Sequence, residues 1–232
     1  MVEKIIGILG GMGPEATADL YMRIIRATKV QRDQDHYRVI IDSNAKIPDR
    51  TPAIQGKGPS PLPMLVETGL NLQRAGADFL IIPCNTAHYF HGDLQKKLRI
   101  PVLHMIRLSA EKTHARHPEV KKAGLLASDG TLMSRLYQES WGRQGIDIIQ
   151  PKAATQRNVM KAIYQHIKRG DLEPGRKLLH DASLELIETG ADAVICGCTE
   201  VSIVLHDGDL SVPVLDPLQD VAEEAVRLAA GP

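Results

Sequence analysis

The chain has 232 residues, of which 43% are hydrophobic, and its 28 lysines and arginines are balanced by 28 acids. This length suffices for one large domain or two small ones, and the neutral balance gives no general attraction to nucleic acid or an anionic membrane. Two Phe, five Tyr and one Trp are too few for base-stacking platforms. We therefore expect a protein that binds neither nucleic acid nor a membrane.

The apolar segments and the cysteine count predict the cellular compartment. The apolar run at residues 5–9 is too short for a signal peptide, and no segment approaches the roughly 18 apolar residues of a membrane span. Three cysteines are too few, and odd in number, for a disulfide framework. A soluble, cytoplasmic protein with reduced thiols is expected.

Short apolar runs alternate with longer amphipathic ones along the chain. The predicted buried strands are Ile5–Leu9, Arg38–Ile41, Phe79–Ile82, Val102–His104, Ala123–Ala127, Asp147–Ile149, Ala193–Cys196 and Val212–Leu215. The predicted helices are Glu15–Thr28, Leu62–Ala75, Ser134–Gln144, Val159–Arg169 and Pro174–Thr189, with a final helix over 217–230. Strands that alternate with helices predict an α/β fold whose parallel sheets are covered on both faces.

The two halves of the chain carry the same motifs in the same order. AGADFLIIPCNTA at 75–87 corresponds to TGADAVICGCTEV at 189–201, and each has Gly-Ala-Asp, a buried strand and then a cysteine eight residues after the glycine. A glycine-containing strand precedes each segment, at 4–9 and 122–126, and a Pro-Val-Leu strand follows each. This pattern indicates an internal duplication.

The duplication predicts two pseudo-symmetric α/β domains with an active site in the cleft between them. We expect the first domain to comprise residues 1–104 and 217–232, and the second to comprise 105–216. Ligands of open α/β sheets bind beyond the carboxyl ends of the strands. Cys84 and Cys198 follow equivalent strands, so the two thiols are expected to face one substrate from opposite sides.

Two opposed thiols suit a reaction that removes a proton from one face of an sp³ carbon and returns one to the other. The unperturbed cysteine pKa of about 8.5 makes both thiol and thiolate accessible near neutral pH. Asn85, Thr86 and Thr199 follow the cysteines and offer donors for an α-carboxylate. Cys196 points the other way by strand alternation and is predicted to be a core residue.

A polar turn follows the first strand of each half. The turn at residues 11–16 fits the G-x-G-x-x-G/A dinucleotide pattern, but acids at 33 and 35 lie before the second strand rather than at its end. A loop around Met12 that binds the substrate carboxylate is therefore preferred. In the second half Ser128 occupies the matching turn, where its hydroxyl either contacts substrate or caps the next helix.

Together these motifs resemble the aspartate/glutamate racemase family, specifically its aspartate racemase branch. The resemblance covers essentially the whole chain and rests on GGMGPEAT at 10–17, IPDRT at 47–51, PCNTAH at 83–88 and GCTE at 197–200. It implies racemisation of aspartate, with glutamate as a further substrate, without pyridoxal phosphate or any other cofactor. It also implies that Cys84 and Cys198 act as proton donor and acceptor, and that the protein is a homodimer.

The resemblance further implies substrate-binding side chains. The family's substrate-binding arginine falls on Arg50, which Thr51 follows in a polar loop after the second strand. A guanidinium suits bidentate binding of a carboxylate. The family's lysine from the second half falls on Lys168, with Lys161 on the same predicted helix as the alternative.

Other functions stay open on the sequence alone. Cys84, His88, Cys196 and Cys198 could ligate zinc, although no Cys-x₂-Cys knuckle is present, and no Gly-x-Ser-x-Gly elbow supports a serine hydrolase. A hydantoin racemase, maleate isomerase or decarboxylase on the same scaffold is the alternative enzyme, and a non-catalytic ligand-binding module is the alternative class. Paired cysteines favour racemisation, because decarboxylation needs only one proton donor.

Overall fold

The computed structural model describes residues 3–231, and the chain forms two compact units. The first unit runs to Met105 and includes the chain from Leu218 on, while the second is Ile106–Pro217. The last helix, α11 (Pro217–Ala229), belongs with the first unit, where the Lys4 N–H donates to the Ala229 carbonyl at 3.0 Å. Helix α5 (Met105–Arg116) follows the strands of the first unit in the sequence but belongs with the second unit. Helix α11, in the same way, follows the strands of the second unit but belongs with the first.

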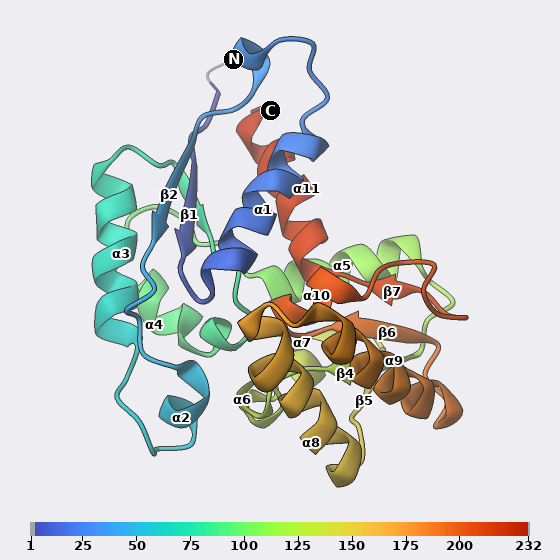
Figure 1. Cartoon of the computed structure of the whole chain (residues 1–232). Helices are drawn as coiled ribbons and strands as arrows, with labels where there is room; N and C mark the ends of the chain where they lie inside the picture. The colour runs from blue at the N-terminus through green and yellow to red at the C-terminus, as the bar shows by residue number, and fades with distance from the viewer. Residues whose placement is uncertain (1–2, 232) are drawn as a thin grey trace. The chain divides into compact units, whose positions relative to one another are not determined.

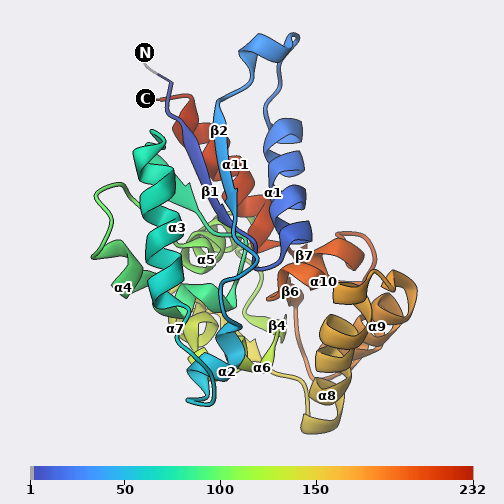
Figure 2. The ribbon, with the colours of Figure 1, turned by 60° about the vertical axis from the view of Figure 1, so that its left-hand side comes forward.

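A three-stranded parallel sheet lies at the centre of the first unit. Its strands, in the order β2-β1-β3, are β1 (Ile6–Gly10), β2 (Val39–Ser43) and β3 (Phe79–Ile81). Helix α3 (Leu62–Arg74) covers one face, while α1 (Pro14–Ala27) and α11 cover the other (Figure 1, Figure 2). All of β1 is buried, as expected for a strand covered on both faces.

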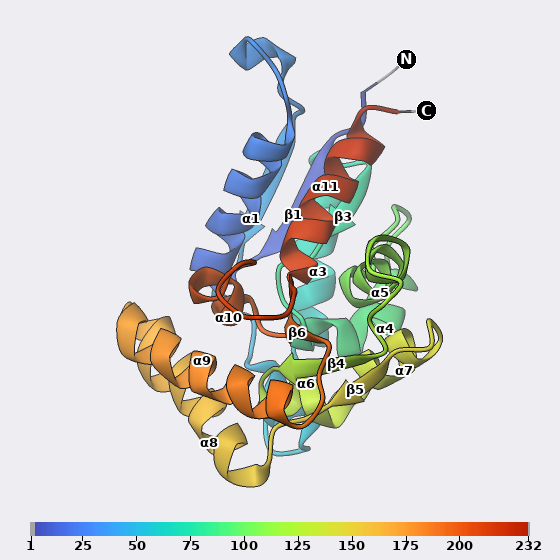
Figure 3. The ribbon, with the colours of Figure 1, turned by 90° about the vertical axis from the view of Figure 1, so that its right-hand side faces the viewer.

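A four-stranded parallel sheet lies at the centre of the second unit. Its strands, in the order β5-β4-β6-β7, are β4 (Lys122–Leu126), β5 (Asp147–Ile149), β6 (Ala193–Cys196) and β7 (Val214–Leu215). Helices α8 (Ala153–Lys161) and α9 (Leu172–Glu188) lie on one face, while α5 and α7 (Leu136–Gly142) lie on the other (Figure 3).

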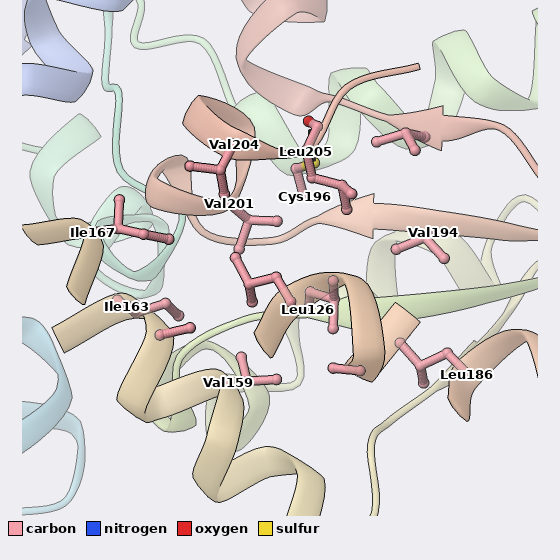
Figure 4. Packing of buried hydrophobic residues seen from close by; sticks show 14 of the residues in the cluster. Leu126, Val159, Ile163, Ile167, Leu186, Val194, Cys196, Val201, Val204 and Leu205 are labelled. Carbon is pink, nitrogen blue, oxygen red and sulfur yellow. Dashed lines mark hydrogen bonds between the residues drawn. The ribbon is translucent and has the colours of Figure 1, made fainter. Parts of the chain in front are cut away.

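Alternation along the strands separates two apolar cores in the second unit. Val194 and Cys196 pack with Leu126 on the side of α8 and α9, as Figure 4 shows, whereas Ala193 and Ile195 pack on the side of α5 and α7. Cys196 is fully buried. The prediction that it is a core residue is confirmed.

The repeated Gly-Ala-Asp motif ends a helix and begins a strand in both units. Gly76 and Gly190 adopt φ angles of +97° and +96°, which favour glycine, and they follow the C-terminal ends of α3 and α9. The Asp78 carboxylate accepts from a backbone N–H just before β1 at 2.6 Å, and the Asp192 carboxylate accepts from two N–H groups at the start of β4 at 3.0 and 2.9 Å. In both units the motif therefore has the same role: the glycine ends a helix, and the aspartate binds the backbone at the start of the neighbouring strand.

The Pro-Val-Leu motif fills the next strand position in both sheets. The Pro101 carbonyl accepts from the Leu80 N–H at 2.8 Å, and the Pro213 carbonyl accepts from the Val194 N–H at 2.9 Å. Only an isolated bridge follows in the first unit, so the strand predicted over Val102–His104 is wrong in extent. If the bridge at Val102 is counted as a fourth strand position, the first sheet has the same strand order as the second. The predicted fold class of two parallel-sheet α/β units is confirmed.

Short helices connect these elements. They are η1 (Asp33–Asp35), α2 (Arg50–Ile54), η2 (Thr86–Phe90), α4 (His91–Gln95), α6 (Asp129–Ser134), the π-helix η3 (Ala162–His166), η4 (Ile167–Arg169) and α10 (Thr199–Val204). Within residues 3–231, none of the helices is both long and apolar enough to cross a membrane.

Two predicted helices are wrong. The helix predicted over Ser134–Gln144 is broken, because Arg135 adopts a φ of 55° and separates α6 from α7. The helix predicted over Val159–Arg169 begins at Ala153 and passes through η3 and η4 before it ends. Apart from the strand over Val102–His104, the other predicted helices and strands agree with the structure to within a residue or two at each end.

Candidate active site

Cys84 lies three residues beyond the end of β3, in the core of the first unit. Its side chain is 5% exposed and belongs to the apolar cluster that includes Met12. Strands β1 and β3 are parallel, with Ile8 in register with Ile81, so the Met12 loop and the Cys84 turn leave the sheet at the same edge. The structure therefore brings these two predicted site residues together.

His88 holds the backbone of the Cys84 turn. Its Nδ1 lies 2.8 Å from the Cys84 carbonyl oxygen, and the Met105 N–H donates to its Nε2 at 3.1 Å. Because Nε2 accepts a hydrogen bond, the ring is neutral and Nδ1 carries the hydrogen donated to Cys84. Burial lowers the pKa of His88 to about 4, so the ring stays neutral near physiological pH.

Asn85 and Thr86 follow Cys84 in the same buried turn, which leads into η2. Their exposed fractions are 3% and 7%. The Asn85 carbonyl accepts from the His88 N–H at 3.1 Å, which closes the first turn of η2. The polar residues predicted to accompany Cys84 are thus part of one turn that His88 supports.

Arg50 was predicted to lie in a polar loop, but it is the first residue of helix α2. Asp49 explains this start, since its side chain caps the helix by accepting from the Thr51 N–H at 3.0 Å. Arg50 is only 9% exposed, and its Nη2 and Nη1 donate to the carbonyls of Met12 and Pro48 at 3.3 and 3.0 Å. These bonds orient the guanidinium beside the Met12 loop.

Cys198 stands at the corresponding point of the second unit, two residues beyond β6, where it precedes α10. It is partly exposed, and its thiol donates to Oε2 of Glu200 at a sulfur–oxygen distance of 2.8 Å. The Thr199 Oγ1 lies 3.4 Å from the same oxygen. Glu200 is only 6% exposed, so this carboxylate faces the protein rather than bulk solvent.

Lys168 approaches the other oxygen of Glu200. Its Nζ lies 3.4 Å from Oε1 and 4.7 Å from the centroid of the Tyr164 ring. The π-helix η3 and the turn η4 set this position, and such π interruptions are frequent at functional sites. Three predicted site residues, Cys198, Thr199 and Lys168, therefore gather around Glu200, to which the sequence analysis assigned no role.

Ser128 lies at the carboxyl edge of the second sheet. Leu126 is in register with Cys196, so Ser128 and Cys198 leave the sheet at the same edge. The Ser128 Oγ accepts from the Thr131 N–H at 3.5 Å and caps α6, which is one of its two predicted roles. Its contact with substrate stays a prediction. Lys161, the alternative to Lys168, is exposed and lines a cavity of about 470 Å³ along α8.

The donor groups that could hold a metal are dispersed. All three cysteines are free. Across the described residues, 3–231, no group of three or more His, Cys, Asp or Glu side chains is arranged to hold a metal ion. These residues supply no ligand set for the zinc alternative.

Comparisons with known proteins cover nearly the whole chain. Residues 9–225 match the family model described as Asp/Glu/Hydantoin racemase. The chain is also 28% identical over 228 residues to the broad specificity amino-acid racemase RacX of Bacillus subtilis (strain 168), an alignment that covers 95% of this chain and 96% of that protein.

Two solved structures share the fold from end to end. One is the aspartate racemase of Picrophilus torridus, with a TM-score of 0.87, 28% identity and coverage of 98% of this chain and 94% of that one. The other is an aspartate racemase homologue from Pyrococcus horikoshii OT3, with a TM-score of 0.79, 25% identity and coverage of 99% and 100%. Both similarities therefore extend over the two units.

Proposed function

Because the chain belongs to the Asp/Glu/Hydantoin racemase family, we propose that it interconverts L- and D-aspartate by a two-base mechanism that uses Cys84 and Cys198 and no cofactor. The observation that carries this proposal is the repetition of the cysteine position. Each cysteine follows the β-strand that pairs with the central strand of its own sheet, β3 beside β1 and β6 beside β4. A two-base reaction at one carbon needs two such groups.

In the proposed mechanism the thiolate of one cysteine takes the α-proton, and the thiol of the other protonates the opposite face. The electron pair of the broken C–H bond is delocalised into the α-carboxylate between the two steps. Each full reaction moves one proton onto one sulfur and one proton off the other, so the two cysteines exchange states. Thiols suit this role because both of their protonation states are accessible near neutral pH.

We propose that the remaining side chains bind the carboxylates of aspartate. In the first unit the Arg50 guanidinium, oriented by the Met12 carbonyl, would bind one carboxylate. Thr51, Asn85 and Thr86 would contribute further donors there. In the second unit Ser128, Thr199 and Lys168 would contact the substrate beside Cys198. The Lys168 ammonium has three donors and already lies 3.4 Å from Glu200.

A second candidate is racemisation of a broad range of amino acids. It is favoured by the similarity to RacX, which is described as a broad specificity amino-acid racemase. The Picrophilus torridus relative, by contrast, is described as an aspartate racemase. The two candidates differ only in substrate range, and a panel of amino acids separates them.

The test is racemisation by the purified full-length protein, dialysed against EDTA and supplied with no cofactor. L-Aspartate, L-glutamate, L-alanine and L-lysine would be incubated separately, and chiral chromatography would quantify the D-enantiomers. We expect D-aspartate to form, and Cys84→Ser and Cys198→Ser each to slow its formation by about 10²- to 10⁴-fold. Cys196→Ala is the matched control, because this third thiol lies in the core. Comparable rates for all four substrates would support the broad-specificity candidate, and no racemisation of any would contradict both.

We also propose that the protein works in the cytoplasm as a homodimer. The three free cysteines are compatible with a reducing compartment. The dimer follows from the family resemblance. Light scattering after size-exclusion chromatography should give twice the chain mass of 25.4 kDa, and a monomer mass would contradict the assembly.

A further inference from the structure

The second unit holds a charged pair around the Cys198 thiol that the proposed reaction does not by itself require. The thiol sulfur lies 2.8 Å from Oε2 of Glu200, and the Lys168 Nζ lies 3.4 Å from Oε1. The three groups therefore form a chain of thiol, carboxylate and ammonium. Glu200 is buried, with a side chain 8% exposed, whereas the Lys168 side chain is 30% exposed. The carboxylate is the fixed member of the chain, and the lysine is its solvent-facing member.

The electrostatics of this chain determine where its proton resides. An ammonium beside a carboxylate favours the ionised carboxylate. An ionised carboxylate can only accept hydrogen bonds, so the hydrogen between Glu200 and Cys198 stays on sulfur. A thiolate at the same position would face the carboxylate with like charge, which disfavours it. The partial neutralisation of Glu200 by Lys168 weakens that repulsion.

The surroundings of Cys84 differ on this point. Within its own unit the Cys84 side chain packs among apolar residues such as Met12, and its hydrogen-bonded neighbour is the neutral His88, which binds its carbonyl. Within that unit's described residues no carboxylate is hydrogen-bonded to the Cys84 thiol. A carboxylate that acts on the reacting sulfur is therefore a feature of Cys198.

We infer that Glu200 is a positioning residue that keeps Cys198 protonated between turnovers, and that Lys168 limits the strength of this effect. The inference rests on the proposed racemase function and assigns the proton-donor state of the free enzyme to Cys198. Glu200 accepts the hydrogen bond from the thiol, and no proton passes to it in the proposed step. When Cys198 donates, its S–H bond breaks as the new Cα–H bond forms, and the sulfur keeps the electron pair as a thiolate. For a further turnover in the same direction, solvent reprotonates that thiolate while the other thiol gives up to solvent the proton it took; in the reverse direction the thiolate takes the α-proton of the opposite enantiomer.

The test measures alkylation by iodoacetamide, because the thiolate and not the thiol reacts. The full-length protein would be treated at a series of pH values, and fragment-ion mass spectrometry would quantify labelling at Cys198, Cys196 and Cys84 separately. For Glu200→Gln we expect Cys198 labelling at pH 7 to become about tenfold faster, equivalent to a downward shift of the reaction midpoint by about one pH unit. For Lys168→Met we expect the opposite shift. Glu200→Asp keeps the charge and should lie close to the wild type.

Two controls separate this role from a merely structural one. Glu188→Gln removes the same charge from an exposed position on α9 and should leave Cys198 labelling unchanged. The Cys84 midpoint in the Glu200→Gln sample should also stay constant. An unchanged or raised Cys198 midpoint in Glu200→Gln would overturn the inference, and so would an equal acceleration at Cys84, which indicates loosened packing. Labelling requires no turnover, so a protein that racemises nothing would contradict the proposed function while this result would still decide the role of Glu200.

Discussion

The turns that carry Cys84 and Cys198 follow equivalent strands, yet different groups hold them. At Cys84 the contact is to the backbone, where buried, neutral His88 donates to the carbonyl at 2.8 Å. At Cys198 the contact is to the thiol itself, which donates to Glu200 at 2.8 Å. One turn is held by a neutral ring, and the other lies against a charged pair.

This difference separates what the duplication repeats from what it does not. The repeated parts serve the backbone: Gly76 and Gly190 end a helix, and Asp78 and Asp192 join that helix to the neighbouring strand. The groups around the two sulfurs are not repeated. A two-base reaction needs its two thiols in different protonation states at any moment, and unequal surroundings are one physical means to that end.

The largest expected effect comes from removing either sulfur. Cys84→Ser and Cys198→Ser should each lower the rate of aspartate racemisation by about 10²- to 10⁴-fold, because a serine hydroxyl is too weak an acid to exchange roles with a thiolate. Chiral chromatography measures this directly, with Cys196→Ala as the control. If one of the two variants kept the wild-type rate, only one thiol would act, and the two-base mechanism would be contradicted.

The next effect concerns stability, and it tests whether the His88 ring that holds the Cys84 turn is neutral. The His88 pKa is about 4 in the folded protein against an ordinary value of 6.5. The unfolded chain therefore binds one more proton between pH 6.5 and pH 4, and stability falls by about 3 kcal/mol as the pH drops through this window. The contribution is fully present above pH 6.5 and fully lost below pH 4.

Urea unfolding at pH 7 and at pH 4.5 measures this loss. His88→Gln, which is neutral at both values, should show a smaller difference in free energy of unfolding between them than the wild type. Exposed His114→Gln serves as the control and should keep the wild-type difference. Equal differences in all three proteins would show that His88 is not held neutral.

A smaller effect is expected at the buried guanidinium of the first unit. Arg50→Lys keeps the charge but loses the planar fork, so the KM for aspartate should rise by about tenfold with a smaller change in kcat. Steady-state kinetics measures this split, and Arg74→Lys, at an exposed position on α3, is the matched control. An unchanged KM would mean that Arg50 only joins its helix to the Met12 loop.

The smallest expected effect is at the cap of α6. Ser128→Ala should lower the free energy of unfolding by about 1 kcal/mol, whereas Ser128→Asp should retain the cap and most of the stability. Chemical denaturation measures both. No loss in Ser128→Ala would contradict the cap, and a rise in KM in a variant of unchanged stability would assign the hydroxyl to substrate instead.

Much of the fold was predictable because it depends on local signals. Alternating apolar runs located the strands to within a residue or two, and the repeated motif located both cysteines at matching strand ends. The break at Arg135 was not predictable, because a non-glycine residue with a φ of 55° carries no local signal. The strand predicted over Val102–His104 was too long, since only one bridge pairs it with β3.

The chemistry around the sulfurs was less predictable. Arg50 and Lys168 were named through the resemblance, but the partners that orient them, Met12 and Glu200, lie 38 residues and 32 residues away in the sequence. Glu200 stood within the quoted motif at 197–200, and no sequence signal shows that its side chain folds back onto the thiol two residues earlier. That contact depends on the turn from β6 into α10.

The most direct test of the two-thiol account is the isotopic content of the first product. L-Aspartate carrying hydrogen at Cα would be incubated with the wild-type protein in D₂O, and both enantiomers would be separated and analysed by mass spectrometry at low conversion. The account predicts that D-aspartate carries deuterium at Cα from the first turnover while the remaining L-aspartate keeps its hydrogen, because a different sulfur, exchanged with solvent, protonates the opposite face. D-Aspartate that retained the substrate's own hydrogen would show one base acting on both faces, and would contradict the account.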